Sequence, residues 1–208
     1  MRHLIMFSGG IKSTTLLKYV IREGEAIALY FEHGFVHEQV AAHQLADHLG
    51  VEFIVETLTG SPSKVQGWPL FKTTWMLFHA LTLASQFGCQ QVCYGICSRP
   101  WCRENTRPYL DTLRLLVQKA QGELPTIEIE APLILLHTTD VVQLGNRLEV
   151  PWIETRSCEH NEILHCGRCI HCRRRAVAFS LTETFDPTVY VQSPWKEDTS
   201  DDDEFSED

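Results

Sequence analysis

The chain has 208 residues, of which 44% are hydrophobic and 22% are charged, a composition typical of a globular protein with a single core. Its formal net charge of −9 is concentrated in the last 13 residues, KEDTSDDDEFSED, whose eight acids and one lysine contribute −7 and leave −2 for residues 1–195. This nearly neutral body has no broad basic face for duplex nucleic acid, and no segment reaches the roughly 18 apolar residues of a membrane span.

Short apolar runs alternate with helical patterns along the first 150 residues. Strands are predicted at 3–7, 26–31, 52–57, 90–96 and 126–133. Helices are predicted at 13–24, 37–50, 73–88, 107–122 and 138–148, and a polar loop at 58–69. The alternation predicts an α/β fold, Rossmann-like, with a parallel sheet and helices on both faces, in which ligands bind at the carboxyl ends of the strands. Residues 1–195 are expected to form one domain.

A candidate phosphate-binding loop, MFSGGIKSTT (6–15), follows the first predicted strand. The Walker pattern needs glycine at two positions that hold Met6 and Ile11 here, and GxGxxG fails because only Gly9 and Gly10 are present. What remains is a strand, a Ser-Gly-Gly turn and a helix. Adjacent glycines allow a tight turn whose N–H groups, together with the helix N-terminus, face an anion. The serines at 8 and 13 add hydroxyl donors.

Four cysteines near the C-terminus form the pattern C-x7-C-x2-C-x2-C. They are Cys158, Cys166, Cys169 and Cys172. Four thiolates favour a closed, structural, tetrahedral zinc site, and an iron–sulfur cluster is the alternative. The histidines within this stretch are expected to be bystanders, and the cysteines at 89, 93, 97 and 102 to be mostly small buried residues.

The segments after the cysteine pattern have simple interpretations. Arginines 173–175 are expected to open a helix as a solvated basic turn, unless one of them reaches ligand phosphate or nucleic acid. The acidic segment 196–208 is expected to be a disordered, solubilising tail, with a regulatory or nucleic-acid-mimicking arm as the alternative. The apolar run at the start is too short for a signal peptide, so a cytoplasmic location is expected.

The glycine loop and the cysteine pattern, in this order, resemble the QueC family of 7-cyano-7-deazaguanine (preQ0) synthases, within the PP-loop ATP pyrophosphatase superfamily. FSGGIKSTTLL is similar to the family's FSGGxDSTTxL, and HCGRCIHC to its zinc knuckle. Further similarity lies in Gly34 and His37, in PWCRE, and in APLILLHTTDVVQLG. The resemblance extends from residue 4 to about residue 183.

The resemblance implies the ligands and the site residues. The ligands are ATP with magnesium, a 7-deazaguanine carboxylate and one structural zinc, and a homodimer is usual for the family. The implied nucleotide contacts are Phe7, Ser8, Gly9, Gly10, Ile11, Lys12, Ser13, Thr14 and His37. The implied catalytic residues are Lys12, Ser13, Lys72 and Arg103. Arg103 is a candidate for holding the substrate carboxylate, with a surface ion pair as its alternative, and His37 is either a ligand contact or a helix-start residue.

Three features depart from the family pattern. Lys12 stands where the loop has aspartate, so it either holds a phosphate oxygen or marks a chain that handles ATP differently. Lys72 stands near an expected arginine and lacks the bidentate fork. The stretch from Gly95 to Cys102 is shorter and lacks the Asp-x-Ser-Gly that would line a base pocket.

Three functions are compatible with these features. The first is a preQ0-type synthase that makes an amide or a nitrile from a 7-deazaguanine carboxylate, ATP and ammonia. The second is a divergent QueC-like protein, of the kind found in phages and anti-phage systems, that joins a deazaguanine to an amine on a protein or nucleic acid. The third is a nucleotide-binding relict without catalysis.

Overall fold

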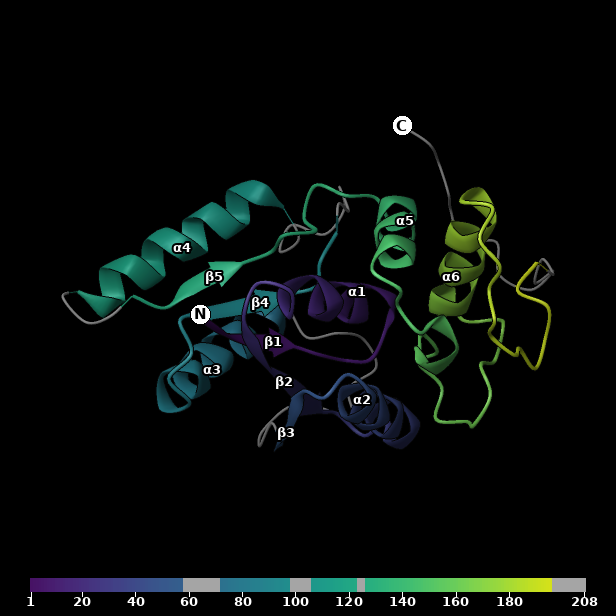
Figure 1. The fold of residues 1–208 in the computed structure, drawn as a ribbon, viewed down its shortest axis with the longest axis horizontal. Coiled ribbons are helices and arrows are strands. Elements are labelled where there is room, and N and C mark those ends of the chain that lie inside the picture. Colours follow the sequence, from purple (N-terminus) through teal and green to yellow (C-terminus); the bar gives the residue numbers. More distant parts are fainter. Residues whose placement is uncertain (58–71, 98–105, 123–125, 196–208) are drawn as a thin grey trace.

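A parallel five-stranded sheet forms the centre of the molecule in the computed structural model, which describes residues 1–57, 72–97, 106–122 and 126–195 (Figure 1). The strands are β1 (Arg2–Met6), β2 (Glu25–Glu32), β3 (Glu52–Thr57), β4 (Gln91–Tyr94) and β5 (Glu128–Glu130). Their order is β3-β2-β1-β4-β5, and every pairing is parallel. The order reverses between β1 and β4, which is where ligands bind in doubly wound folds.

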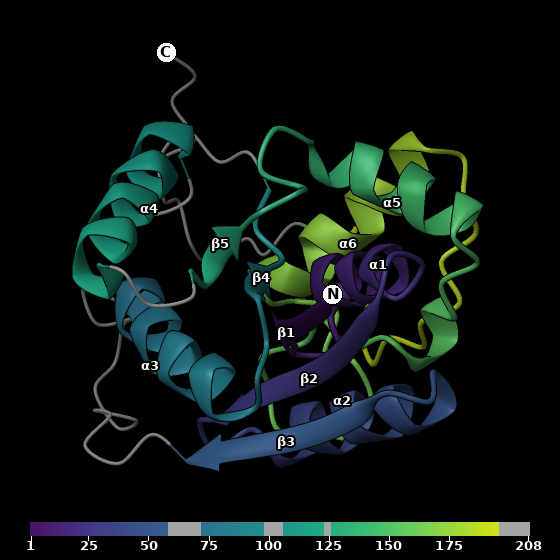
Figure 2. The ribbon, with the colours of Figure 1, turned by 60° about the vertical axis from the view of Figure 1, so that its left-hand side comes forward.

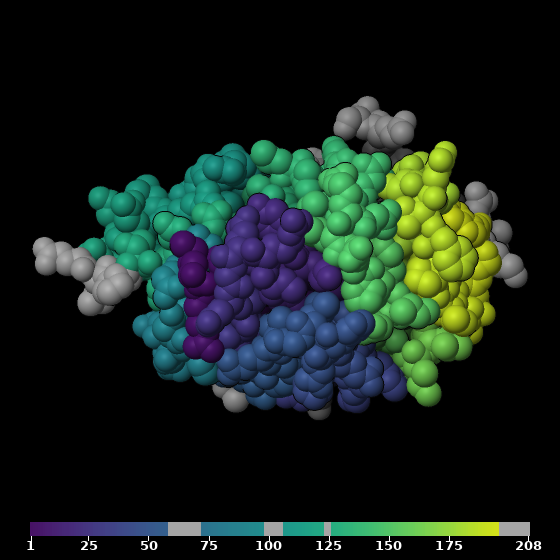
Figure 3. Space-filling view, viewed as in Figure 1, coloured from purple at the N-terminus to yellow at the C-terminus, as the bar shows by residue number. Residues whose placement is uncertain are grey.

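Helices cover both faces of the sheet. They are α1 (Ile11–Val20), α2 (Val36–His48), α3 (Lys72–Gln86), α4 (Arg107–Gln121), α5 (Thr138–Arg147) and α6 (Ile170–Leu181), with a short 3-10 turn η2 (Trp152–Glu154). Figure 2 shows α3 and α4 on one side, and α1, α5 and α6 on the other. In the space-filling view the C-terminal segment packs against α5 at the end of the molecule opposite α4 (Figure 3).

Two apolar cores result from the alternation of side chains along the strands. Ile5, Ala28 and Tyr30 face a core shared with α1, α2, α5 and α6. Their neighbours Leu4 and Leu29 face a second core shared with α3 and α4. Because both faces of the sheet are covered, the central strand β2 is apolar at every position from Ala26 to Phe31, as the sequence pattern indicated.

The predicted α/β architecture is confirmed, while several element boundaries differ. The fifth strand covers only Glu128–Glu130, because turns replace the extended chain from residue 132 onward. The last helix begins at Ile170, inside the cysteine pattern, and not at the arginines that follow it. The loop at 58–69 and the tail at 196–208 lie outside the described residues. Within the described residues, no helix has both the length and the apolar character to cross a membrane.

Candidate active site

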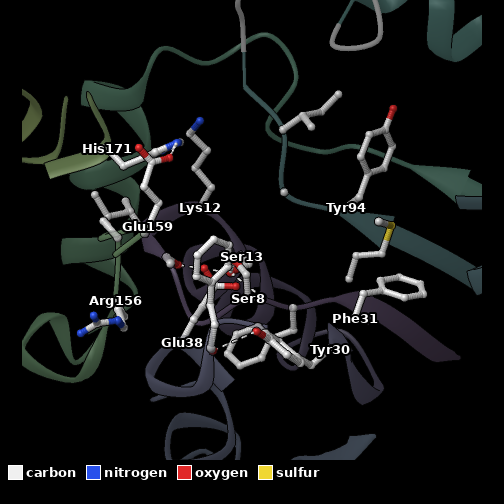
Figure 4. A pocket seen from close by; sticks show the side chains of 18 of the residues that line it. Ser8, Lys12, Ser13, Tyr30, Phe31, Glu38, Tyr94, Arg156, Glu159 and His171 are labelled. Carbon is white, nitrogen blue, oxygen red and sulfur yellow. Dashed lines mark hydrogen bonds and ion pairs between the residues drawn. The ribbon is translucent and has the colours of Figure 1, made fainter. Parts of the chain in front are cut away.

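A cavity of 410 Å³ opens at the carboxyl ends of β1, β2 and β4, at the reversal of strand order (Figure 4). Its floor is the segment from Met6 to Ser13, which contains the Ser-Gly-Gly turn and the first turn of α1. The far wall comes from the cysteine segment and α6, which contribute Glu159, His171 and Arg174. Residues distant in sequence therefore surround the predicted phosphate loop.

The backbone of the Ser-Gly-Gly turn faces this cavity. Gly9 has a φ of +69°, and a Cβ there would lie 2.9 Å from the Cα of Ala42 in α2, so the position requires glycine. Gly10 is the N-cap of α1 and makes no side-chain cap hydrogen bond. The Ser13 hydroxyl accepts a hydrogen bond from the Ser8 N–H at 3.3 Å. The first turn of α1 therefore presents its N–H groups and its positive dipole end to the cavity.

The structure brings most of the predicted site residues together. Those that line the cavity are Phe7, Ser8, Gly10, Ile11, Lys12, Ser13 and Lys72. Gly9, Thr14 and His37 do not line it: Thr14 is fully buried, and the backbone N–H of His37 donates to Asn161 Oδ1 at 3.3 Å. Arg103 lies outside the described residues. Lys12 points towards Glu159 and His171, which form an ion pair of 3.2 Å when His171 is protonated (Figure 4).

Sequence reasoning missed several side chains of the cavity wall, among them the ionisable residues Glu38, Glu159 and His171. Glu38 is in the first turn of α2, and its position just after the second strand is the signal that could have revealed it. Glu159 and His171 each flank a cysteine of the C-terminal pattern. No local pattern marks these two, since they reach the cavity only because the whole segment folds against the loop.

Lys72 is the half-buried lysine on the α3 side of the cavity. Burial lowers its pKa to about 8, although the negative charge of Glu38 opposes the shift. Lys72 therefore carries its charge at pH 7 and loses it as the pH rises above about 8. A buried lysine with this pKa can hold a phosphate or carboxylate near neutrality.

The affinity for ATP is expected to fall about tenfold between pH 7 and pH 9.5 as Lys72 deprotonates. The Lys72→Arg variant should keep its affinity over the same range, because guanidinium stays protonated. Isothermal titration at a series of pH values measures both. An equal decline in the two proteins would show that another group is responsible.

The four cysteines of the C-terminal pattern form a buried cluster. Their sulfur atoms all lie within 4.8 Å of one another, and Sγ of Cys166 and Sγ of Cys172 are 4.0 Å apart. Tetrahedral zinc with bonds of about 2.3 Å requires sulfur separations of about 3.8 Å. Backbone N–H groups of Cys169 and Cys172 donate to Cys166 and Cys169 sulfurs at 3.3 and 3.4 Å, which stabilises thiolates. The cluster therefore fits a tetrahedral metal ion.

Arg156 connects this cluster to the phosphate loop. Its backbone N–H donates to the Gly9 carbonyl at 2.9 Å. Its buried guanidinium donates to the carbonyl oxygens of His160 and Ile163 at 2.9 and 3.0 Å, within the loop between the first two cysteines. The metal cluster and the glycine turn are thus parts of one hydrogen-bonded unit.

Arg175 corrects the expectation of a solvated basic turn at 173–175. Its side chain is 1% exposed, and its Nε pairs with Asp186 Oδ1 at 3.0 Å. The guanidinium also donates to Thr155 Oγ1 at 2.6 Å and to the Trp152 carbonyl at 2.9 Å. The residue is buried because α6 starts one turn earlier than expected, which directs this position into the core. Arg175 ties α6 to the η2 turn.

Removal of the Arg175 guanidinium is expected to be costly. The Arg175→Met variant should lose about 3–5 kcal/mol of unfolding free energy, because the partly buried carboxylate of Asp186 would be left without its cation. The exposed Arg22→Met variant is the matched control and should change the stability by less than about 0.5 kcal/mol. Urea denaturation followed by circular dichroism measures both values. A near-neutral Arg175→Met would contradict this assignment.

Comparisons with known proteins identify the family of the chain. The family described as "Queuosine biosynthesis protein QueC" matches residues 64–183. The 7-cyano-7-deazaguanine synthase of Polynucleobacter asymbioticus is 32% identical over 223 residues, which cover 90% of this chain and 91% of that protein. That of Nostoc punctiforme is 29% identical, with 92% and 100% covered. The solved NMN synthetase from Francisella tularensis shares the fold, with a TM-score of 0.51 at 14% identity, covering 88% of this chain and 77% of that one. The chain therefore belongs to the QueC family.

Proposed function

We propose that this protein uses ATP to convert the carboxylate of a 7-carboxy-7-deazaguanine into an amide and then a nitrile, with ammonia as the nitrogen donor. The observation that carries the proposal is the open Ser-Gly-Gly turn, which shares one cavity with Lys12 and Lys72. A helix N-terminus and two lysines supply positive charge to the anionic ligands, which are a triphosphate and a carboxylate. The names of the curated relatives support the same chemistry.

The reaction needs ATP because a carboxylate has a poor leaving group. A carboxylate oxygen attacks phosphorus, and an acyl-adenylate or acyl-phosphate forms as pyrophosphate or ADP leaves. Ammonia then attacks the carbonyl carbon, the activated oxygen departs with the nucleotide or phosphate, and a proton is released to give the amide. A second ATP activates the amide oxygen, and loss of that oxygen with two protons gives the nitrile.

The residues around the cavity take distinct roles in this scheme. The N–H groups of the first turn of α1, with Ser8 and Ser13, hold the triphosphate in line for attack. Lys12 stabilises the negative charge that develops on the transferred group. Lys72 adds a positive charge beside the triphosphate, and Arg103 is the candidate for holding the substrate carboxylate. Magnesium would accompany ATP and neutralise part of its charge.

We infer that the four-cysteine cluster holds zinc. A full set of four thiolates leaves no open position for water, so the ion is structural and takes no part in the reaction. It stabilises the wall that carries Glu159 and His171.

Incubation with ATP, 7-carboxy-7-deazaguanine and ammonium chloride, followed by mass spectrometry, tests the proposal. We expect amide and nitrile products together with AMP or ADP. An amide product without nitrile would favour the divergent protein that joins a deazaguanine to another amine, and ATP binding without any product would favour the nucleotide-binding relict. Absence of ATP binding in isothermal titration would contradict the enzymatic proposal altogether.

A further inference from the structure

Part of the cavity wall is apolar and suits a flat ring. Its aromatic and thioether side chains come from β2, the N-cap of α2, α3 and β4; they are Tyr30, Phe31, Phe35, Met76 and Tyr94. Such walls stack on planar heterocycles and offer them little polar recognition. The polar groups among them therefore decide which heterocycle fits.

Glu38 is a carboxylate within this wall. Its side chain extends from the first turn of α2 into the cavity (Figure 4). The Oε1 atom is fully buried, and no residue that the structure describes meets the geometry of a hydrogen bond to it. The Tyr30 hydroxyl is also a neighbour of this carboxylate, and burial together with Glu38 raises the pKa of Tyr30. A buried carboxylate oxygen without a donor is costly, and a ligand that supplies the donor gains that energy on binding.

His33 is the ring that lies beside the Glu38 carboxylate, and its protonation state decides whether it can donate a hydrogen bond to that carboxylate. Its Nδ1 lies 2.7 Å from the Phe31 carbonyl oxygen, which can only accept, so Nδ1 carries the hydrogen. In the neutral ring, Nε2 then has a lone pair, and it lies 3.3 Å from Oε1 of Glu38. Within this pair, His33 therefore donates to Glu38 only when the imidazole is protonated.

We propose that Glu38 is the specificity-determining residue that accepts the ring N1–H and the 2-amino group of a guanine-type substrate. A carboxylate with two oxygens matches two adjacent N–H donors. The edge of adenine presents one amino donor beside the N1 acceptor, which the carboxylate repels. Glu38 thereby makes this part of the cavity select the guanine edge of the deazaguanine over the adenine ring of ATP. This inference rests on the proposed function, since that function supplies a substrate with a guanine edge.

Isothermal titration with two ring compounds tests the role of Glu38. The compounds are 7-carboxy-7-deazaguanine and the analogue that lacks only the 2-amino group. The wild-type protein should prefer the first by about tenfold to a hundredfold, the loss expected for one charge-assisted hydrogen bond. Glu38→Gln should reduce the preference to about threefold or less, because its amide offers one acceptor and one opposing donor.

Two controls separate recognition from folding and from charge. Glu38→Gln should bind ATP as tightly as the wild type or more tightly, because the variant removes a negative charge from the cavity. Glu159→Gln removes a charge from the opposite wall and should keep the wild-type preference for the 2-amino group. A wild-type preference that persists in Glu38→Gln, or equal binding of both compounds by the wild type, would overturn the inference and leave the proposed function standing. Failure of the wild type to bind either compound would overturn both.

Discussion

Replacement of Cys172 by serine is expected to release the metal and to destabilise the C-terminal part of the molecule. Cys172 is fully buried in the first turn of α6, and its sulfur is one of the four in the cluster. Metal binding at such sites supplies about 10–16 kcal/mol in isolated peptides, so loss of one ligand removes a large part of the folding free energy. We expect the melting temperature to fall by at least about 10 °C.

The matched control for this substitution is Cys97→Ser. Cys97 is equally buried, but it lies outside the cluster, with its sulfur 3.6 Å from the Thr138 hydroxyl. Elemental analysis should find one zinc per chain in the wild type and in Cys97→Ser, and far less in Cys172→Ser. Iron with visible absorption in the wild type would make the zinc assignment wrong. Retention of the metal by Cys172→Ser would contradict the four-thiolate site.

Removal of the Lys12 ammonium is expected to weaken ATP binding by about tenfold to a hundredfold, the contribution of a charge-assisted contact to phosphate. Lys12 lies in the first turn of α1 and lines the cavity. The Lys12→Met variant loses the charge and keeps much of the apolar stem. Lys12→Asp should bind ATP more weakly still, because a carboxylate repels phosphate at the same helix end. Isothermal titration with ATP measures both variants.

Lys18→Met is the control for Lys12. Lys18 is in the last turn of the same helix and does not line the cavity, so its loss should leave the affinity for ATP unchanged. The resembled family has aspartate at position 12, so the Lys12→Asp variant also tests the opposite hypothesis. A Lys12→Asp variant with higher activity than the wild type would show that the lysine is a lesion and not a phosphate contact.

Much of the fold could be predicted because its determinants are local. The buried strands are short apolar runs, and the helices between them end at glycines, so the parallel sheet follows from alternation. The phosphate loop could be predicted for the same reason, since the adjacent glycines Gly9 and Gly10 allow a tight turn directly after a strand. The four cysteines were visible from their spacing alone.

The rest of the site depends on packing that no short pattern records. Glu159 and His171 reach the cavity because Arg156 fastens the cysteine segment to Gly9. Arg175 is buried because α6 begins within the metal-binding pattern. The three consecutive arginines do not by themselves indicate which side chain lies in the core. These are contacts between distant segments, and sequence spacing does not encode them.

In the proposed function, ATP activates the substrate carboxylate in the cavity above the glycine turn. The most direct measurement uses 7-carboxy-7-deazaguanine labelled with oxygen-18 in both carboxylate positions, with mass spectrometry of the released nucleotide and phosphate. Since each activation leaves one substrate oxygen on phosphorus, we predict that both labels appear in AMP or in orthophosphate when the nitrile forms. ATP turnover that leaves these products unlabelled would contradict the account.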